Sequence, residues 1–284
     1  MKDRVSRFFW KITPKNGVSR FVGSMAKKRF SRHFIPFYIK KFQIDLNPVK
    51  KPVDQFESLL DFFVRELNAE ARPIDTDPKK VTSPVDGVIT QMGKIEEGTI
   101  IQAKGISYRL EDLLAGDSKT DQFFNGQFAT IYLSPRDYHR IHSPISGEIE
   151  SLTYIPGNLY PVNESGVRLF PGLFTQNERV ISYIDSEFGQ VALVKVGATN
   201  VGSIKVTYDQ EIATNAGRKQ QKNKKIYPKA IRMKKGEELG RFEFGSTVIL
   251  IFEPNMINWL PNISKGISIK MGQPIAEVIP RKKD

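Results

Sequence analysis

The sequence predicts an α+β protein with a mostly β body, closest to a barrel-sandwich, behind a basic helical N-terminal region. Three observations lead to this prediction. Short runs of β-branched and aromatic residues, separated by Gly, Pro and Asn, follow one another from about residue 80 onward. The clearest helical spacing of apolar residues lies ahead of these runs, and a seven-residue motif occurs twice among them. We therefore expect a helical region over residues 1–48 and a β-rich domain over residues 49–284.

The N-terminal region is strongly basic. The chain of 284 residues carries a net charge of +12, and residues 1–45 hold twelve basic residues against two acidic ones. This segment therefore supplies ten of the twelve net charges. Its large apolar residues are Phe8, Phe9, Trp10, Phe21, Val22, Met25, Phe30, Phe34, Ile35, Phe37, Tyr38, Ile39 and Phe42. We expect short helices, broken at residues 14–17 and near Pro36.

This composition is typical of helices that lie in the interface of an anionic bilayer. No stretch reaches the roughly 18 apolar residues of a spanning helix. A secretory signal is not expected, because the apolar run FFW is short and no small-residue cleavage site follows it. Two alternatives stay open: a helical hairpin packed on the protein, and a surface that binds nucleic-acid phosphates. Since no recognised nucleic-acid motif is visible, we expect an anionic membrane as partner and no nucleic acid.

Within the body, apolar residues at helical spacing in DQFESLLDFFVREL predict a helix over residues 54–67. The predicted strands cover residues 87–95, 127–133, 147–155, 190–196 and 246–252. A second basic stretch, residues 218–235, contains nine Lys and Arg residues, no acid, and the polar run KQQKNKK. We expect this stretch to be an exposed loop.

The repeated motif covers residues 83–89 (SPVDGVI) and 143–149 (SPISGEI). Together with the later segment IKMGQPIAEVI, it resembles the hairpins of lipoyl and biotinyl carrier domains, whose fold is a small β barrel-sandwich. A carrier needs an exposed lysine in a tight turn between the two half-motifs, and neither copy has one there. The resemblance therefore predicts strand topology and not function.

Histidine chemistry has few candidates, because the chain contains only His33, His139 and His142, and it has no cysteine. His139 and His142 lie three residues apart in YLSPRDYHRIHSPISG, between two predicted strands. A metal pair would need carboxylates such as Asp137 as further ligands, so we expect no metal. A purely structural role stays open, but the polar surroundings favour acid–base chemistry.

Ser246 opens the strand STVILIF directly after Gly245. Taken alone, Asp86 in PVDGV is a turn residue that caps its own backbone. Together, an aspartate, a loop histidine and a serine at a strand edge are the parts of an Asp-His-Ser triad. A serine hydrolase would use such a triad on an external substrate. However, the Gly-x-Ser-x-Gly motif is missing, and Ser246 begins a strand instead of a strand-to-helix turn.

An activated serine directly after glycine has a second use. Its hydroxyl can attack the carbonyl carbon of Gly245 and replace the peptide bond by an ester. Elimination across Ser246 then cuts the chain and leaves dehydroalanine, which hydrolyses to an N-terminal pyruvoyl group. Glycine suits the attacked position because it has no Cβ and tolerates strained backbone conformations. His142, oriented by Asp86, would be the base.

The chain resembles the bacterial membrane-associated phosphatidylserine decarboxylase proenzymes over roughly residues 55–280. The matching stretches are FFVRELNAEARPIDTDP, SPVDGVITQMGKIEEGTIIQAKG, LSPRDYHRIHSPISG, LFTQNERV, VGATNVGSI and GRFEFGSTVILIF. In that family an Asp-His-Ser triad performs self-cleavage, and it corresponds here to Asp86, His142 and Ser246. His139 matches the family residue assigned to decarboxylation. The chain departs from the family pattern at Phe244, where Leu or Gly is usual, and a larger side chain there is expected to alter the cleavage rate.

The resemblance implies cleavage between Gly245 and Ser246 into a β chain (1–245) and an α chain (246–284). The covalent cofactor it implies is a pyruvoyl group made from Ser246. This group would form a Schiff base with phosphatidylserine, act as the electron sink for loss of CO2, and release phosphatidylethanolamine. The implied setting is the cytoplasmic side of the cell membrane, with a peripheral attachment, and the implied assembly is a homodimer of processed units.

Three other functions stay open. A pyruvoyl-dependent decarboxylase of a soluble amino acid would share the Gly-Ser cut but would not need the basic N-terminal region. A serine hydrolase would keep the chain whole. A carrier or a non-catalytic lipid-binding barrel would keep its binding after Ser246→Ala.

Overall fold

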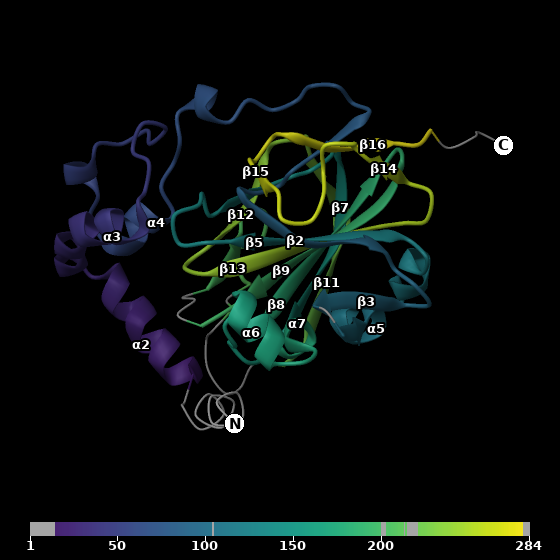
Figure 1. Cartoon of the computed structure of the whole chain (residues 1–284), viewed down its shortest axis with the longest axis horizontal. Helices are drawn as coiled ribbons and strands as arrows, with labels where there is room; N and C mark the ends of the chain where they lie inside the picture. The colour runs from purple at the N-terminus through teal and green to yellow at the C-terminus, as the bar shows by residue number, and fades with distance from the viewer. Residues whose placement is uncertain (1–14, 104, 200–202, 213, 215–220, 281–284) are drawn as a thin grey trace.

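The computed structural model describes residues 15–103, 105–199, 203–212, 214 and 221–280. Short N-terminal helices lie to one side of a body built mainly from antiparallel sheets (Figure 1). The prediction of a mostly β, α+β fold is therefore confirmed. The sheets of the described residues are open, and they do not close into a barrel. Phe8, Phe9 and Trp10 lie outside the described residues.

The N-terminal helices are α2 (Lys15–Lys27), the 3-10 helix η1 (Arg29–Phe34), α3 (Ile35–Phe42), the 3-10 helix η2 (Val53–Gln55) and α4 (Leu59–Phe63). Pro36 lies in the first turn of α3, where the missing N–H would have no partner within the helix. The residue therefore marks both the end of η1 and the start of α3. The break predicted at residues 14–17 is wrong for residues 15–17, which form the first turn of α2. First-turn N–H groups have no partner within a helix, so Asn and Gly are tolerated there.

The helix predicted over residues 54–67 is also wrong in extent, since α4 has only five residues. Ser58 caps it by accepting a hydrogen bond from the Asp61 N–H, which fixes the start of the helix. Phe56 is buried from an extended position ahead of this cap. The apolar residues of this segment are thus buried as predicted by their spacing, but some of them are buried from turns and not from one continuous helix.

The largest sheet has eight antiparallel strands in the order β11-β7-β8-β9-β13-β5-β2-β15. Their bounds are β11 (Asn223–Met233), β7 (Gly147–Ile155), β8 (Arg179–Ser186), β9 (Gly189–Gly197), β13 (Ser246–Phe252), β5 (Gln127–Leu133), β2 (Gly87–Lys94) and β15 (Ser268–Ile269). The five predicted strands are confirmed as β2, β5, β7, β9 and β13. Residues 223–233 were predicted to be a loop, and this is wrong, because they form β11 at the edge of the sheet. Lysine-rich, exposed edge strands are common because charge prevents edge-to-edge pairing.

Two three-stranded sheets complete the body. One has the order β10-β12-β6, and the other has the order β1-β16-β14. Their bounds are β10 (Ile204–Val206), β12 (Glu238–Phe242), β6 (Arg140–His142), β1 (Lys80–Thr82), β16 (Pro274–Val278) and β14 (Ile257–Trp259). The remaining elements are the hairpin β3 (Thr99–Ala103) and β4 (Ile106–Arg109), the helices α5 (Leu110–Leu114), α6 (Glu164–Leu169) and α7 (Leu173–Gln176), and the 3-10 helices η3 (Ala69–Ala71) and η4 (Thr120–Phe123).

Strand β13 is central and buried on both faces. Val248 and Leu250 belong to one hydrophobic core, while Ile249 and Ile251 belong to a second core on the opposite face. This two-sided burial explains why the strand reads as an unbroken apolar run. Its first residue, Ser246, is therefore held in a rigid place.

The two copies of the sequence repeat make matching contacts. The Ser83 and Ser143 hydroxyls each donate to the carbonyl two residues ahead, at 2.7 Å. The copies also bond to each other reciprocally, through Thr82 N–H to Pro144 O at 2.9 Å and His142 N–H to Pro84 O at 2.8 Å. The repeat is thus a structural one, which brings His142 next to the turn that holds Asp86. The likeness to carrier hairpins stays a prediction.

Two further hydrophobic clusters hold the N-terminal helices, one joining them to each other and one joining them to Phe244 of the body. Ile35 of α3 packs with Phe56 and Phe62 in one cluster, and Ala26 of α2 packs with Phe63 and Phe244 in the other. Among the helices that the structure describes, none is both long and apolar enough to cross a bilayer. The boundary at residue 48 stays a prediction.

Candidate active site

The connection from β12 to β13, residues 243–245, carries the candidate cleavage point. Ser246 is the first residue of β13 and pairs with Leu133 of β5 and Gly197 of β9. Phe244 has φ = 84°, a left-handed conformation that is rare for a bulky residue. At Gly245, an added Cβ would have one neighbour within 4 Å in the described part of the chain, the Thr199 carbonyl oxygen at 3.6 Å. The strain therefore lies one residue before the position at which it was expected.

The hydroxyl of Ser246 is fully buried and has no hydrogen-bond partner among the described residues. The neighbouring Thr247 hydroxyl is also buried without a partner. A buried hydroxyl without a partner costs roughly 1–3 kcal/mol. Such a group calls for an explanation, and a chemical role next to a strained bond is one.

Phe244 packs against aromatic neighbours. Its ring centroid lies 4.5 Å from that of Phe63 in α4, and the Phe63 ring also contacts the imidazole of His139, at 4.0 Å between centroids. The side chain that departs from the family pattern is therefore accommodated between the cleavage point and α4. These contacts join His139 to the cleavage segment through Phe63.

His139 is completely buried. Its Nδ1 lies 2.9 Å from the Asp137 carbonyl oxygen, which can only accept, so Nδ1 carries the proton. Nε2 then has a free lone pair, and it has no partner in the described part of the chain. Burial is the main reason that the pKa of His139 is lowered to about 3. The imidazole is therefore neutral at physiological pH, with a bare proton acceptor in an aromatic pocket.

His142 is held through both ring nitrogens. Nδ1 donates to the Gly236 carbonyl oxygen at 2.8 Å, and Nε2 accepts from the Tyr138 hydroxyl at 3.1 Å. Burial is the main cause of its lowered pKa, so this imidazole is also neutral. The sequence reasoning missed Tyr138, although it precedes His142 by four residues in YHRIH.

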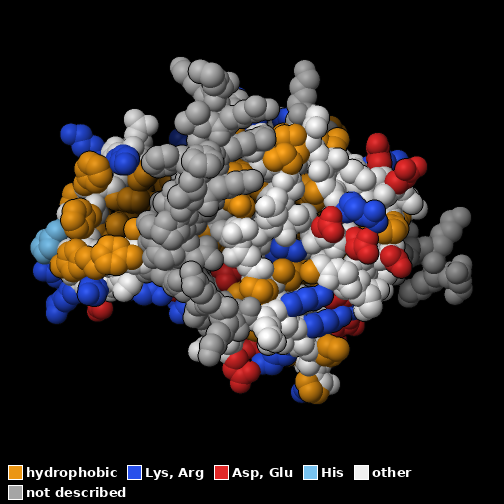
Figure 2. All heavy atoms as spheres, turned by 90° about the horizontal axis from the view of Figure 1, so that it is seen from below, with side chains coloured by type: hydrophobic (Ala, Val, Ile, Leu, Met, Phe, Trp, Pro, Cys, Tyr) orange, Lys and Arg blue, Asp and Glu red, His pale blue; other side chains and the backbone are white. Residues whose placement is uncertain are grey.

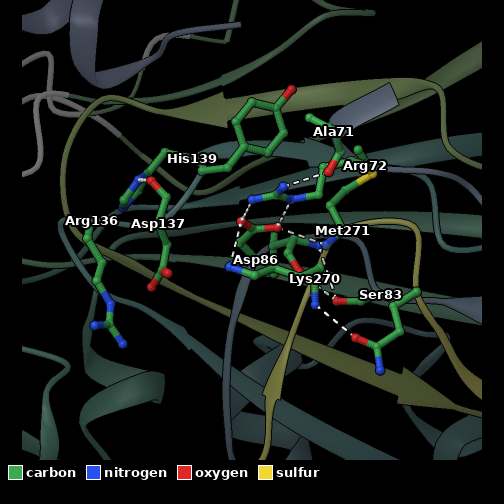
Figure 3. Close-up of polar contacts among 12 residues, drawn as sticks. Ala71, Arg72, Ser83, Asp86, Arg136, Asp137, His139, Lys270 and Met271 are labelled. Atoms are coloured by element: carbon green, nitrogen blue, oxygen red, sulfur yellow. Dashed lines mark hydrogen bonds and ion pairs between the residues drawn. The ribbon is translucent and has the colours of Figure 1, made fainter. Parts of the chain in front are cut away.

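Asp86 is buried and paired with a cation (Figure 3). The Arg72 guanidinium binds both carboxylate oxygens, with Nε donating to Oδ1 at 2.8 Å. The Met271 N–H donates to Oδ1 at 2.9 Å, and Lys270 Nζ lies 3.4 Å from Oδ2. Burial alone would raise the pKa of Asp86, but these partners, Arg72 above all, hold it below its ordinary value. Asp86 is therefore ionised.

A turn-capping role does not account for the carboxylate. In the second copy of the repeat, Ser146 takes the equivalent place and accepts from the Lys235 N–H at 3.0 Å. A hydroxyl is thus enough for this contact with a distant backbone N–H, which Asp86 makes with Met271. Asp86 adds a buried negative charge with a dedicated arginine. Arg72 was not identified from the sequence, because its pairing with Asp86 depends on the path of the chain between them.

Two residues of the predicted triad, Asp86 and Ser246, lie at the same end of the sheet. Thr247, Tyr132 and Val88 lie opposite one another across β13, β5 and β2. Two strand spacings separate β13 from β2, which is about 10 Å. Since β13 and β2 run in the same direction, Ser246 and Asp86 lie at the same edge. Among the described residues, no hydrogen bond joins any two of Asp86, His142 and Ser246, so the triad stays a prediction.

A cavity of about 660 Å³ opens beside this edge. Its lining includes Asp86, Arg72 and Tyr138 together with Arg136 and Lys270. Within the described ranges, no group of three or more His, Asp or Glu residues is placed to hold a metal ion.

Comparison with known proteins identifies relatives over most of the chain. The family model described as phosphatidylserine decarboxylase matches residues 59–277. A phosphatidylserine decarboxylase proenzyme of Brevibacillus brevis is 46% identical over 265 residues, which cover 93% of this chain and 94% of the relative. The protein of that name from Escherichia coli O9:H4 is 42% identical over 93% of this chain and 85% of its own length. The one from Aliivibrio salmonicida is 38% identical over 98% and 99% of the two chains.

Proposed function

The chain belongs to the phosphatidylserine decarboxylase family, and we propose that it is a precursor that cuts itself between Gly245 and Ser246. The cut makes the pyruvoyl group with which phosphatidylserine is converted to phosphatidylethanolamine. The observation that carries the proposal is the buried, unpartnered hydroxyl of Ser246. It directly follows Gly245 and the strained Phe244.

The proposed cleavage needs no reactant other than the chain itself and one water molecule. Ser246 Oγ attacks the Gly245 carbonyl carbon, its proton passes to a base, and the peptide C–N bond is replaced by an ester. Removal of the Ser246 α-proton then breaks the Cβ–O bond, frees the Gly245 carboxylate and leaves dehydroalanine. Hydrolysis of its enamine with loss of ammonia leaves a ketone at the new N-terminus. The left-handed Phe244 favours cleavage as a whole, because separation of Gly245 from residue 246 releases its backbone strain.

His142 is the proposed base, oriented by Asp86. In the uncut chain the lone pair on His142 Nε2 already accepts from Tyr138, and Asp86 is already paired with Arg72. The base therefore acts after Tyr138 turns away, and the imidazolium that forms is stabilised by the negative charge of Asp86. Both histidine and aspartate start in the required ionisation state, neutral and negative respectively.

The residues around Ser246 fit a covalent pyruvoyl group. When present, this group supplies a carbonyl that acts as an electron sink during loss of CO2. The rigid pairing of Ser246 between β5 and β9 would hold the group in place. His139 enters the reaction neutral, so Nε2 is available first to accept a proton from the substrate amine and later to return one. The aromatic pocket of Phe63 and Phe244 excludes water from this exchange.

The N-terminal helices support a peripheral attachment to an anionic membrane, which we propose for the cytoplasmic side. Their exposed aromatic side chains are flanked by basic ones (Figure 2). The exposed large hydrophobic residues of this region are Phe21, Val22, Phe30, Phe34, Phe37 and Leu46. Aromatic groups anchored in the interface and cations near anionic headgroups both contribute to binding. We further propose that the β and α chains stay associated and that processed units form a homodimer.

The test of the proposed function is an intact mass spectrum of the purified, denatured protein. Two fragments are expected, one ending at Gly245 and one starting at residue 246 but lighter by one ammonia than a serine start. Ser246→Ala is expected to remain uncut. Thr247→Val is the matched control, because it removes the adjacent unpartnered hydroxyl and is expected to be cut normally. An uncut wild-type chain that decarboxylates phosphatidylserine would overturn the proposal.

A further inference from the structure

Three cations lie side by side on the small sheet that leads into the cleavage segment. Arg241 of β12 is directly opposite Lys205 of β10 on one side and Arg140 of β6 on the other. Directly opposite residues in antiparallel strands project from the same face and lie close together, and like charges in such pairs are destabilising. This row therefore needs a source of negative charge.

The carboxylates of the protein neutralise the two ends of the row but not its centre. Arg140 pairs with Glu66 at 3.2 Å and with Glu238 at 2.7 Å. Lys205 lies 3.5 Å from Glu243, whose other oxygen is 2.9 Å from Lys27 of α2.

Arg241, at the centre of the row, has no such partner. It has neither an ion pair nor a hydrogen-bond acceptor for its side chain among the described residues, and its Nε is buried without a partner. An unpaired guanidinium next to two further cations is a candidate anion-binding site.

Arg241 also lines two adjoining cavities under α2. The larger, of about 630 Å³, is bordered by Ser24 and Lys27 of α2 and by β10 and β12. The smaller, of about 420 Å³, shares Lys27 and Arg241 and reaches α4, but Glu57, Asp61 and Glu243 also line it. The larger cavity is therefore the one that suits an anion. Two carboxylates line the larger cavity. Asp209 is held by Lys225 and Tyr227, and Glu238 by Arg140. Neither is free to neutralise Arg241.

The position of these cavities suits one part of a phospholipid. Arg241 precedes Ser246 by five residues, so the two are at most about 17 Å apart along the chain. The exposed Phe21 belongs to α2, the helix whose Ser24 and Lys27 line the larger cavity. In a phospholipid the phosphodiester lies between the acyl-bearing glycerol and the reacting headgroup amine. A phosphate site is therefore required between the membrane-facing helices and Ser246, and these cavities lie there.

We propose that Arg241, assisted by Lys27 and Lys205, binds the phosphodiester of the phospholipid substrate. The proposal rests on the proposed function and assigns the substrate's anionic group a place within it. Arg241 is the residue that specifies a phosphorylated substrate over a free amino acid, because its guanidinium can bind two phosphate oxygens at once.

The first test uses the processed wild-type enzyme and Arg241→Gln with a short-chain phosphatidylserine below its micelle concentration, so that membrane binding plays no part. Arg241→Gln is expected to be cut normally by intact mass, to raise KM about tenfold or more, and to change kcat little. Arg241→Lys is expected to restore part of the affinity. Lys229→Gln, which removes one charge from the exposed part of β11, is the matched control and is expected to keep the wild-type KM. An unchanged KM in Arg241→Gln overturns the proposal.

The second test does not depend on catalysis. In the uncut Ser246→Ala chain, calorimetric titration with glycerophosphoserine is expected to show binding that Arg241→Gln weakens about tenfold or more. Inorganic phosphate is titrated in parallel. Equal affinity for both would show a general phosphate site and would overturn the assignment to the lipid headgroup, as would equal binding by the two variants. Absence of decarboxylation by the wild-type chain would instead count against the proposed function alone, since this titration still judges the site.

Discussion

At the scale of single residues, His139 illustrates how burial sets chemistry. Its Nδ1 donates a hydrogen bond to a backbone carbonyl, and its Nε2 has no partner among the described residues. The imidazole stays neutral because the charged form would lose its hydration on burial and would gain no hydrogen bond at Nε2. The same features that leave Nε2 available to a substrate make the residue a liability for folding in acid. The protein therefore keeps an unpartnered imidazole nitrogen at the expense of stability at low pH.

This liability can be measured. The folded-state pKa of His139, about 3, is below its ordinary value, so the unfolded chain takes up a proton that the folded chain refuses. The stability it contributes is present above about pH 6.5 and is lost as the pH falls toward 3. Between pH 7.5 and 5 we expect this residue to lower the free energy of unfolding by up to about 2 kcal/mol.

The measurement is urea unfolding at both pH values in the uncut Ser246→Ala chain, with and without His139→Gln. His142 also has a lowered pKa and acts in the same direction in both proteins, so the difference between them isolates His139. Asp86 has a lowered pKa and loses its contribution only below about pH 4, outside the range. An equal pH dependence in the two proteins would show that His139 is not held neutral by burial.

At the scale of elements, helix α2 and the connection at residues 243–245 are held together by an ion pair and apolar contacts. Lys27 at the end of α2 pairs with the buried Glu243, and Ala26 packs in the same cluster as Phe244. The Ser203 hydroxyl donates to the Glu243 carboxylate at 2.7 Å, which fixes the acid in place. Helix α2 is thus attached directly to the residues that precede the proposed cleavage point.

We expect this attachment to appear as an energetic coupling. Lys27→Met and Glu243→Gln, made singly and together in the Ser246→Ala chain, should show a coupling of about 0.5–1 kcal/mol in urea unfolding. The value is modest because the Lys27 side chain is 49% exposed. The pair of Lys50 and Glu66, exposed on both sides, serves as the control and should couple less. Additive effects in the first cycle would mean that α2 is attached by apolar contacts alone.

The elements also show what the sequence could and could not predict. β13 was predictable because burial on both faces leaves an unbroken apolar run, and Gly245-Ser246 at its start marks the site. β11 was not, because an exposed edge strand and a basic loop have the same composition. His139, His142, Asp86 and Ser246 could be named from residue types and motifs. Their partners could not, because contacts such as Arg140 with Glu238, 98 residues apart, depend on the folded topology.

At the scale of the whole molecule, charge and exposed aromatic residues gather at the same end. The N-terminal helices present Phe34 and Phe37, 53% and 63% exposed, among the basic residues of η1 and α3. Removing residues 1–48 would take Ile35 away from Phe56 and Phe62, against which it packs, so a truncation would mix lost membrane binding with lost stability. Point changes on the exposed face separate the two.

We expect Phe34→Ser with Phe37→Ser to weaken binding to vesicles that contain phosphatidylserine by about tenfold or more. Loss of two partly inserted aromatic groups removes apolar area from the bilayer, at roughly 25 cal/mol per Å². Ile226→Ser on β11 is the control, because Ile226 is 69% exposed but lies at the opposite edge of the sheet from β15, outside the N-terminal helices. The measurement is vesicle co-sedimentation at low and high salt.

Salt separates the two contributions to binding. Basic groups near an anionic surface lose most of their attraction at high ionic strength, whereas inserted aromatic groups do not. We therefore expect the wild-type chain to keep part of its binding in high salt and the double variant to keep almost none. The double variant should still decarboxylate short-chain, soluble phosphatidylserine at the wild-type rate, because Ser246 and Arg241 are untouched. A loss of activity on soluble and vesicle substrate alike would mean that these helices shape the active site and do not attach it to the membrane.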